Sequence, residues 1–148
     1  MEDLWFKARM LADPETMAYN HAWGGTLPFP EEERLSWYRR WMECPDGKRF
    51  YRYLVLPENG AFVGEAAYRR AEDTGFFLAD VLIYAPFRGR GYGRTGLRLL
   101  CGEAAARGIG ALYDRIAADN TAALNLFCSE GFETAERTEA SVLVRKKL

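Results

Sequence analysis

The segment over residues 81–93 constrains what this chain can fold into more than any other part of it. An apolar run with the pattern of a buried strand leads into a turn with glycine at the alternate positions 89, 91 and 93, and an amphipathic helix follows. Because glycine has no Cβ, successive N–H groups of such a turn can converge on an anion. The helix adds unpaired N–H groups and the positive end of its dipole. The segment therefore predicts a strand, a turn and a helix with a seat for a phosphate or diphosphate.

Length and charge restrict the classes of protein to which the chain can belong. Its 148 residues are enough for one domain, over residues 1–148, that buries about two thirds of its unfolded surface. The formal net charge of −1 argues against a nucleic-acid partner, because a general nucleic-acid binder normally has a basic excess. No apolar stretch reaches the roughly 18 residues that a membrane-spanning helix needs, so we expect no membrane partner.

The cysteines and the first residues indicate a compartment. Cys44, Cys101 and Cys128 are odd in number and far apart, which is typical of a reduced cytoplasmic protein rather than of a disulfide framework. The first five residues lack the basic start and apolar core of a signal peptide. One histidine and no Cys-x-x-Cys pair disfavour structural zinc, and we expect no metal.

Hydrophobic periodicity and turn residues predict an α/β fold with a mixed sheet and about four helices. We expect a strand at residues 4–10, helices at 14–24 and 30–44, strands at 49–56, 61–69 and 76–85, a helix that ends near residue 108, a strand at 111–118, a helix at 121–130, and a closing hairpin of strands at 132–135 and 141–146. Asn59-Gly60 is a strong hairpin signal, and the three strands around it should form an antiparallel meander. The strand at 111–118 follows a helix and should run parallel to its predecessor.

The glycine turn fits neither of two established nucleotide motifs. The sequence Gly-x-x-x-x-Gly-Lys-Ser/Thr is absent, and the glycine spacing is not that of the dinucleotide fold. One alternative is that the glycines only allow the chain to turn without steric clashes and that the turn binds no ligand. The spacing that does fit is Arg88-x-x-Gly91-x-Gly93, which resembles the acyl-CoA diphosphate motif Arg/Gln-x-x-Gly-x-Gly/Ala of the GNAT superfamily of N-acyltransferases.

A second segment strengthens this resemblance. Asn120-x-x-Ala123-x-x-Leu126-Phe127-x-x-x-Gly131-Phe132 is similar to the segment Asn-x-x-Ala-x-x-Leu-Tyr-x-x-x-Gly-Phe that members of the superfamily commonly carry at this separation from the first motif. The resemblance extends from about residue 50 to the C-terminus, whereas the first fifty residues match only in the expected placement of helices.

The resemblance implies a splayed pair of central parallel strands and a site for acetyl-CoA as the acyl-donor cosubstrate. Main-chain groups of Val81, Leu82 and Ile83 would pair with the amides of the pantetheine arm. The diphosphate would lie against the turn and the start of the helix, which comprise Arg88, Gly89, Arg90, Gly91, Tyr92, Gly93 and Arg94. Asn120 would contact the cofactor arm, or it would only cap the helix that follows it.

The resemblance further implies direct transfer of the acetyl group to a primary amine of a small molecule or a protein. The backbone N–H of Ile83 would polarise the thioester carbonyl. Phe127 stands where the family motif usually has tyrosine, and phenylalanine has no proton to give to the leaving thiolate. We expect Phe127 only to pack against the cofactor. The same departure leaves a second interpretation open, namely a non-catalytic acyl-CoA-binding sensor or regulatory domain.

The general base and the acceptor site are less well defined by the sequence. Glu65 and Asp80, on neighbouring strands, are the candidate bases, and ordinary strand-surface carboxylates are the alternative. Aromatic residues of the N-terminal third either line the acceptor site or belong to the core; they are Trp23, Phe29, Trp37, Tyr38 and Trp41. Members of the superfamily often dimerise, so the resemblance allows a homodimer.

Overall fold

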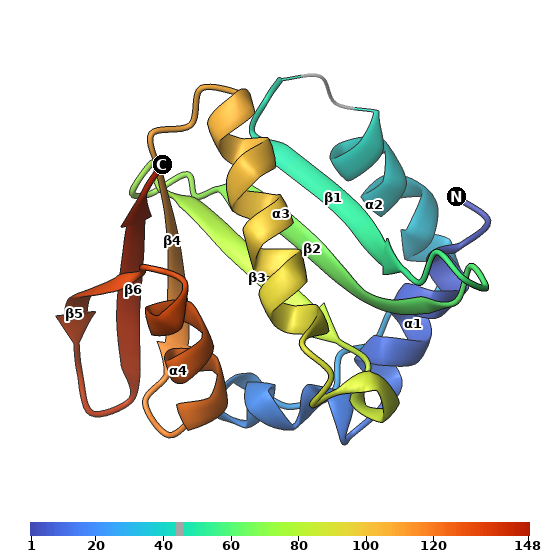
Figure 1. Ribbon diagram of the computed structural model, residues 1–148. Coiled ribbons are helices and arrows are strands. Elements are labelled where there is room, and N and C mark those ends of the chain that lie inside the picture. Colours follow the sequence, from blue (N-terminus) through green and yellow to red (C-terminus); the bar gives the residue numbers. More distant parts are fainter. Residues whose placement is uncertain (44–45) are drawn as a thin grey trace.

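The computed structural model describes residues 1–43 and 46–148, and Figure 1 shows the path of the chain. The described elements are the α-helices α1 (Leu4–Ala12), α2 (Glu31–Met42), α3 (Tyr92–Ala106) and α4 (Thr121–Ser129), the 3-10 helices η1 (Thr16–Trp23) and η2 (Ala85–Phe87), and the strands β1 (Arg49–Val55), β2 (Phe62–Arg70), β3 (Phe77–Ile83), β4 (Ala111–Ala117), β5 (Glu133–Arg137) and β6 (Ser141–Lys147). The predicted α/β class is confirmed, as are all the strands predicted beyond residue 48.

A mixed sheet holds the strands of the described chain in the order β1-β2-β3-β4-β6-β5. The first three strands form the predicted antiparallel meander, in which Tyr51, Ala67 and Asp80 lie side by side across β1, β2 and β3. β4 runs parallel to β3, as predicted, because α3 returns the chain to the same end of the sheet. β6 lies between β4 and β5 and is antiparallel to both.

The parallel pair β3 and β4 is splayed. Its register pairs Leu78 with Tyr113, near the start of both strands, and no further pair is formed among the described residues. Figure 1 shows the two strands diverging from this point toward their carboxyl ends. The second half of β3 therefore has an open gap on its β4 side, as the resemblance implied.

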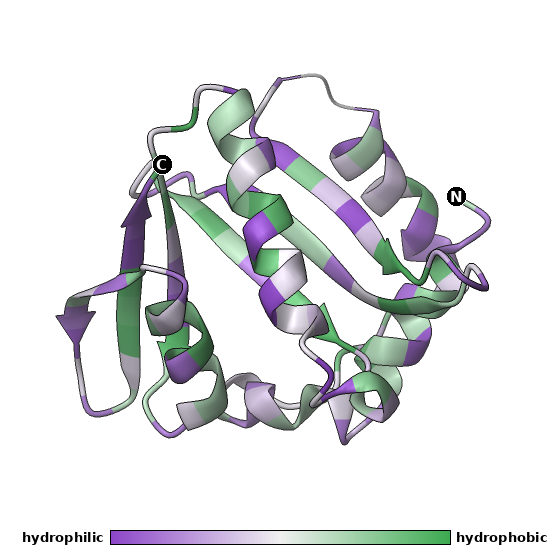
Figure 2. Cartoon of the chain, viewed as in Figure 1, coloured by the Kyte–Doolittle hydropathy of each residue, from purple (hydrophilic) through white to green (hydrophobic). Residues whose placement is uncertain are grey.

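Helices cover both faces of the sheet, because side chains alternate along each strand. Ala66 and Tyr68 of β2 pack with Leu97 of α3 in the largest core cluster, which also includes residues of α4. Ala67 faces the other side and packs with Trp37 of α2. The edge strand β5 differs from these covered strands, because all of its residues are exposed. Figure 2 shows that it is mostly hydrophilic.

The strand predicted at residues 4–10 is wrong, since this segment is helix α1. Leu4, Phe6 and Met10 fit an alternating pattern and also a helical face, and seven residues are too few to separate the two periods. The contact that favours the helix joins this segment to β2, which lies far away in the sequence. Lys7 is buried on the same helical face as Leu4 and Met10, and its ammonium pairs with Glu65 of β2 (Nζ–Oε1 2.8 Å).

The other two N-terminal helices occur with small differences. The helix predicted at residues 14–24 is the 3-10 helix η1, which ends at Gly24 with φ 107°. Asp13 precedes it and accepts hydrogen bonds from the N–H (3.0 Å) and the hydroxyl of Thr16. The helix predicted at residues 30–44 is α2, and its expected end at Cys44 lies outside the described residues.

In the described ranges, Cys101 is buried and Cys128 is exposed, and both are free thiols. No helix in these ranges combines the length and the apolar character that crossing a membrane requires. Nor do residues 1–43 and 46–148 contain a group of three or more His, Cys, Asp or Glu side chains that could hold a metal ion.

Candidate functional site

The glycine turn before α3 leaves a row of main-chain N–H groups without protein partners. Gly89 (φ 74°) and Gly91 (φ 83°) adopt the left-handed conformation, and a Cβ added at either position would meet no atom within 4 Å. Among the described residues, no N–H from Gly89 to Arg94 donates to a protein acceptor, and the N–H of Thr95 is the first that does (3.1 Å, to the Gly91 carbonyl). The turn thus combines free donors, open space and a helix N-terminus, which suits an anionic group such as a diphosphate.

The open edge of β3 leads into this turn. Hydrogen bonds of an antiparallel pair point alternately to the two sides of a strand. The N–H of Tyr84 donates to Val63 of β2 (2.9 Å), so the main-chain groups of Val81 and Ile83 point the other way, into the gap beside β4. The same alternation directs the main chain of Leu82 toward β2, and its side chain is buried. Val81 and Ile83, but not Leu82, therefore offer main-chain groups to an extended ligand.

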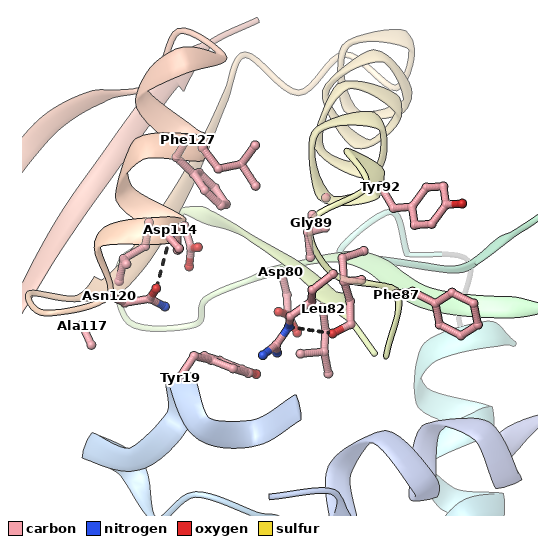
Figure 3. A pocket seen from close by; sticks show the side chains of 18 of the residues that line it. Tyr19, Asp80, Leu82, Phe87, Gly89, Tyr92, Asp114, Ala117, Asn120 and Phe127 are labelled. Carbon is pink, nitrogen blue, oxygen red and sulfur yellow. Dashed lines mark hydrogen bonds between the residues drawn. The ribbon is translucent and has the colours of Figure 1, made fainter. Parts of the chain in front are cut away.

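A cavity of about 380 Å³, here called the turn cavity, connects the glycine turn with the gap. Figure 3 shows Phe127 and Asn120 on one side of it, Gly89 on another, and Tyr19 of η1 across from them. The predicted cofactor-binding residues that line it are Val81, Leu82, Ile83, Arg88, Gly89, Gly91, Tyr92, Gly93, Asn120 and Phe127. The structure thus brings together all the predicted cofactor-binding residues except Arg90 and Arg94.

Phe127 and Asn120 form the α4 side of the turn cavity. The Phe127 side chain is 4% exposed, and its ring packs edge-on against Phe132 with 4.8 Å between centroids. The side-chain Oδ1 of Asn120 accepts a hydrogen bond from the N–H of Ala123 (3.2 Å), so the capping role that was one alternative for Asn120 is confirmed. Its role toward a cofactor stays a prediction.

The three arginines of the turn have different surroundings. The Arg88 guanidinium donates to the carbonyls of Ile83 (3.2 Å), Glu15 (3.1 Å) and Thr16 (2.6 Å), so it joins the turn to η1. Arg94 pairs with Glu130 (Nε–Oε1 3.1 Å). Arg90 lies over the Phe87 ring at 5.6 Å, and no side chain among the described residues forms an ion pair with it. Of the three, Arg90 is therefore the one whose charge is available to an anion.

Two carboxylates, Asp80 of β3 and Asp114 of β4, flank the gap. Both line the turn cavity, and Figure 3 shows them on opposite sides of the space between the strands. Neither forms an ion pair with a side chain of the described chain. Burial raises the pKa of Asp80 to about 6, and the charge of Glu65 contributes. The residue is nevertheless exposed to solvent, because it opens into the cavities between β3 and β4, so the effect of burial on its pKa is partly screened.

Glu65, the other candidate base, is placed differently. Its side chain is 2% exposed, it lines neither the turn cavity nor the larger cavity beside it, and Lys7 holds both its oxygens (2.8 and 3.1 Å). The Tyr51 hydroxyl also donates to it. Both oxygens of Glu65 are therefore already engaged, and the side chain faces neither of the two cavities.

Tyr19 and Asp114 were missed by the sequence analysis. Burial, followed by the charges of Asp80, Glu65 and Asp114, raises the pKa of the Tyr19 phenol, and burial together with Asp80 raises the pKa of Asp114 well above its usual value. No motif marks Tyr19. Asp114 could have been found from the sequence, because it alternates with the apolar residues Leu112 and Ile116. A carboxylate therefore stands on the otherwise apolar face of this strand.

The fold and the site define an α/β protein with a row of unpaired main-chain N–H groups beside a splayed parallel strand pair. The profile of the acetyltransferase (GNAT) domain matches residues 1–133 of the sequence. The chain therefore belongs to the GNAT acetyltransferase family, which confirms the resemblance seen in its two motifs and extends it through the N-terminal third.

Solved structures share this fold at low sequence identity. A domain from Methanocaldococcus jannaschii has a TM-score of 0.79 and 21% identity, covering 99% of this chain and 93% of that one. The yncA protein of Salmonella typhimurium, solved with acetyl-CoA, has a TM-score of 0.70 and 21% identity, covering 90% and 86%. A phosphinothricin acetyltransferase from Sinorhizobium meliloti in complex with acetyl-CoA has a TM-score of 0.71 and 17% identity, covering 95% and 84%. No curated protein matches the sequence significantly.

Proposed function

We propose that this protein transfers the acetyl group of acetyl-CoA to a primary amine of a small molecule or a protein. The observation on which the proposal depends is the row of unpaired N–H groups at the start of α3, beside the open main-chain edge of β3. Together they suit a ligand with an anionic diphosphate and an amide-containing arm. Membership of the GNAT family supports acyl transfer, and two proteins of similar fold were solved with acetyl-CoA.

The donor would lie along the turn cavity. The N–H groups from Gly89 to Arg94 would hold the diphosphate, and Arg90 would add positive charge. The main chain of Val81 would pair with an amide of the pantetheine arm, the N–H of Ile83 would face the thioester end, and Phe127 would pack against the arm. In this role Phe127 needs no hydroxyl.

Bound acetyl-CoA would supply an acetyl group activated as a thioester. The N–H of Ile83 would donate to the carbonyl oxygen and stabilise the negative charge that develops there. Asp80 would take the proton of the attacking amine, directly or through water, and with its pKa near 6 it is mostly ionised at neutral pH. The bond between nitrogen and carbon forms as the bond between carbon and sulfur breaks, and the sulfur leaves as a thiolate. We favour Asp80 over Glu65 because both oxygens of Glu65 are bound by Lys7.

We propose Tyr19 as the donor of a proton to the thiolate, since Phe127 cannot provide one. Tyr19 lines the turn cavity, and its raised pKa keeps the phenol protonated at neutral pH. Release of an unassisted thiolate, which is a tolerable leaving group, is the alternative.

The absence of a hydroxyl at Phe127 favours a second candidate function, a non-catalytic acyl-CoA-binding sensor or regulatory domain. Such a protein would keep the diphosphate seat and the β3 edge and would release no CoA in the presence of amines.

The two functions are separated by incubating the purified protein with acetyl-CoA and pooled primary amines, including peptides. We expect free thiol to appear only when an amine is present, together with a mass increase of the acetylated amine. If CoA binds but no amine is acetylated, the sensor function replaces the transferase. If CoA does not bind, both proposed functions are refuted.

The remaining expectations belong to the same proposal. Residues 1–148 would act as one N-acetyltransferase domain without a metal. The free thiols Cys101 and Cys128 suit a reducing compartment, so we propose a cytoplasmic protein. The family resemblance allows a homodimer.

A further inference from the structure

If Asp80 is the base, the amine must reach it, and a second cavity is lined by this residue. It has a volume of about 550 Å³, which is within the range of small-molecule sites. It shares Tyr19, Trp23, Asp80, Asp114 and Arg115 with the turn cavity, so the two cavities meet at the gap between β3 and β4. An acceptor that entered through the second cavity would present its nitrogen to Asp80 without crossing the cofactor seat.

Aromatic side chains form part of the wall of the second cavity. Trp41 comes from α2, Tyr19 and Trp23 come from η1, and Phe76 precedes β3. The Phe76 ring is stacked on Tyr113, with 4.0 Å between centroids and 3° between planes, so its position is well defined. Aromatic faces attract organic cations as well as apolar chains.

Carboxylates outnumber guanidinium groups on this wall by four to two. The acids are Asp73, Asp80, Asp114 and Glu136, and the bases are Arg69 and Arg115. Arg115 is already engaged, since it donates to the Ser141 hydroxyl (3.2 Å) and lies 3.8 Å from Glu136. Asp80 and Asp114 repel one another, and neither forms an ion pair in the described chain, although the charges of Lys7 and Arg69 act on Asp80 from a distance. A cation that entered would relieve this repulsion without displacing an ion pair.

We propose that the second cavity binds the acceptor and that the acceptor is a small dicationic amine. One primary amine would meet Asp80 and be acetylated, and a second cationic group on the same short chain would pair with Asp114. The aromatic wall would cover the chain between them. This inference rests on the proposed function, because an acceptor site presupposes the acyl donor in the turn cavity.

The test compares three amines with the same four-carbon chain and different far ends: 1,4-diaminobutane, 4-amino-1-butanol and 4-aminobutanoate. We expect kcat/KM for the diamine to exceed that for the amino alcohol by at least about tenfold, as a charge-assisted contact would give, with the aminobutanoate lowest. Calorimetric titration of the same amines into the CoA-saturated protein should give the same order of affinity without relying on turnover.

Two variants test the assignment of Asp114. Asp114→Asn keeps the shape of the side chain and should reduce the preference for the diamine to about threefold or less. Glu72→Gln removes a charge from the adjacent β2–β3 turn, at a residue that does not line the cavity, and should leave the preference unchanged. A change of the same size in both variants would mean a general charge effect and would overturn the assignment.

The outcomes separate this inference from the proposed function. Equal turnover and equal affinity of all three amines overturn the dicationic acceptor and leave the transferase intact. Acetylation of no amine by a protein that binds CoA overturns the transferase and, with it, the acceptor. The amine series uses the unchanged protein, so it decides the inference even if Asp114→Asn fails to fold.

Discussion

At the scale of single residues, the surroundings of Glu65 and Asp80 give two similar carboxylates different properties. Both lie on the same face of the meander, at diagonal positions of β2 and β3. Lys7 forms an ion pair with Glu65, whereas Asp80 forms no ion pair in the described chain and opens into both cavities. The pair Lys7–Glu65 thus holds α1 on the sheet, and the charge of Glu65 helps to raise the pKa of its neighbour.

Replacement of Asp80 tests its role as the base. With the pKa of Asp80 at about 6, kcat/KM of the native protein should rise with pH through about 6 and then level off. In Asp80→Asn this rise should vanish, and the rate should fall by roughly 10²- to 10⁴-fold. The measurement is the pH profile of thiol release, with Glu58→Gln, on the exposed turn between β1 and β2, as the control. A persistent rise near pH 6 in the variant would assign the base to another group.

The same substitution should have an opposite effect on stability. Burial raises the pKa of Asp80 from 3.8 to about 6, so its contribution to stability is fully present below pH 4 and is lost as the pH rises through 6. Because Asp80 is exposed to solvent, which screens this effect, Asp80→Asn should melt only slightly higher than the native protein at pH 8, and the difference should shrink toward pH 4. A variant that melted lower at pH 8 would indicate a structural role for the carboxylate.

At the scale of elements, the site depends on how η1 is fastened to the glycine turn. Arg88 donates to the carbonyls of Glu15 and Thr16, and the N–H of Ala85 donates to the Thr16 hydroxyl (2.9 Å). These bonds place η1 across the gap, with Tyr19 on the η1 side of the turn cavity and Asp80 on the sheet side (Figure 3). The arginine of the motif therefore shapes the site, while the N–H groups behind it provide the donors.

A charge placed in the turn should weaken cofactor binding strongly. Gly91→Glu adds a carboxylate beside the free N–H groups, and its repulsion of a diphosphate should weaken CoA binding by roughly a hundredfold or more. Calorimetric titration with CoA measures the loss. Gly91→Ala has the same backbone strain at φ 83° without the charge and should bind within about tenfold of the native protein.

The matched control for the charge is Gly102→Glu. Gly102 is exposed in α3, and a Cβ added there meets no atom within 4 Å. Its CoA affinity should be unchanged. If Gly91→Glu bound CoA as tightly as this control, the turn would not be the diphosphate seat.

At the scale of the whole molecule, the ligand should tie together elements that meet weakly without it. β3 and β4 share one paired position, and the turn cavity is built from η1, β3, β4, α3 and α4. CoA at a hundred times its dissociation constant should add about 2.7 kcal/mol to the free energy of unfolding, or roughly 5–10 °C in Tm. Pantetheine, which lacks the diphosphate, should raise Tm less at the same concentration. An unchanged Tm with CoA would mean that CoA does not bind the folded protein and would contradict the proposed cofactor.

Much of this architecture could be predicted from local signals. The Asn59-Gly60 turn, the glycines after β3 and the break at Gly131 separate segments whose periodicity shows their type, and the order of these segments predicts the mixed sheet. The segment from Leu4 to Met10 could not be predicted in this way, because its short apolar pattern fits both periods and a buried ion pair with Glu65 selects the helix.

The sequence by itself determined where the turn with unpaired N–H groups lies and to which family the chain belongs, since glycine spacing and main-chain donors depend only on neighbouring residues. The tertiary structure alone decided which carboxylate is neutralised, which one opens into the cavities, and that Tyr19 and Asp114 meet Asp80 at the gap. Burial and charge at these positions arise from residues far apart in the chain, and no local pattern specifies them.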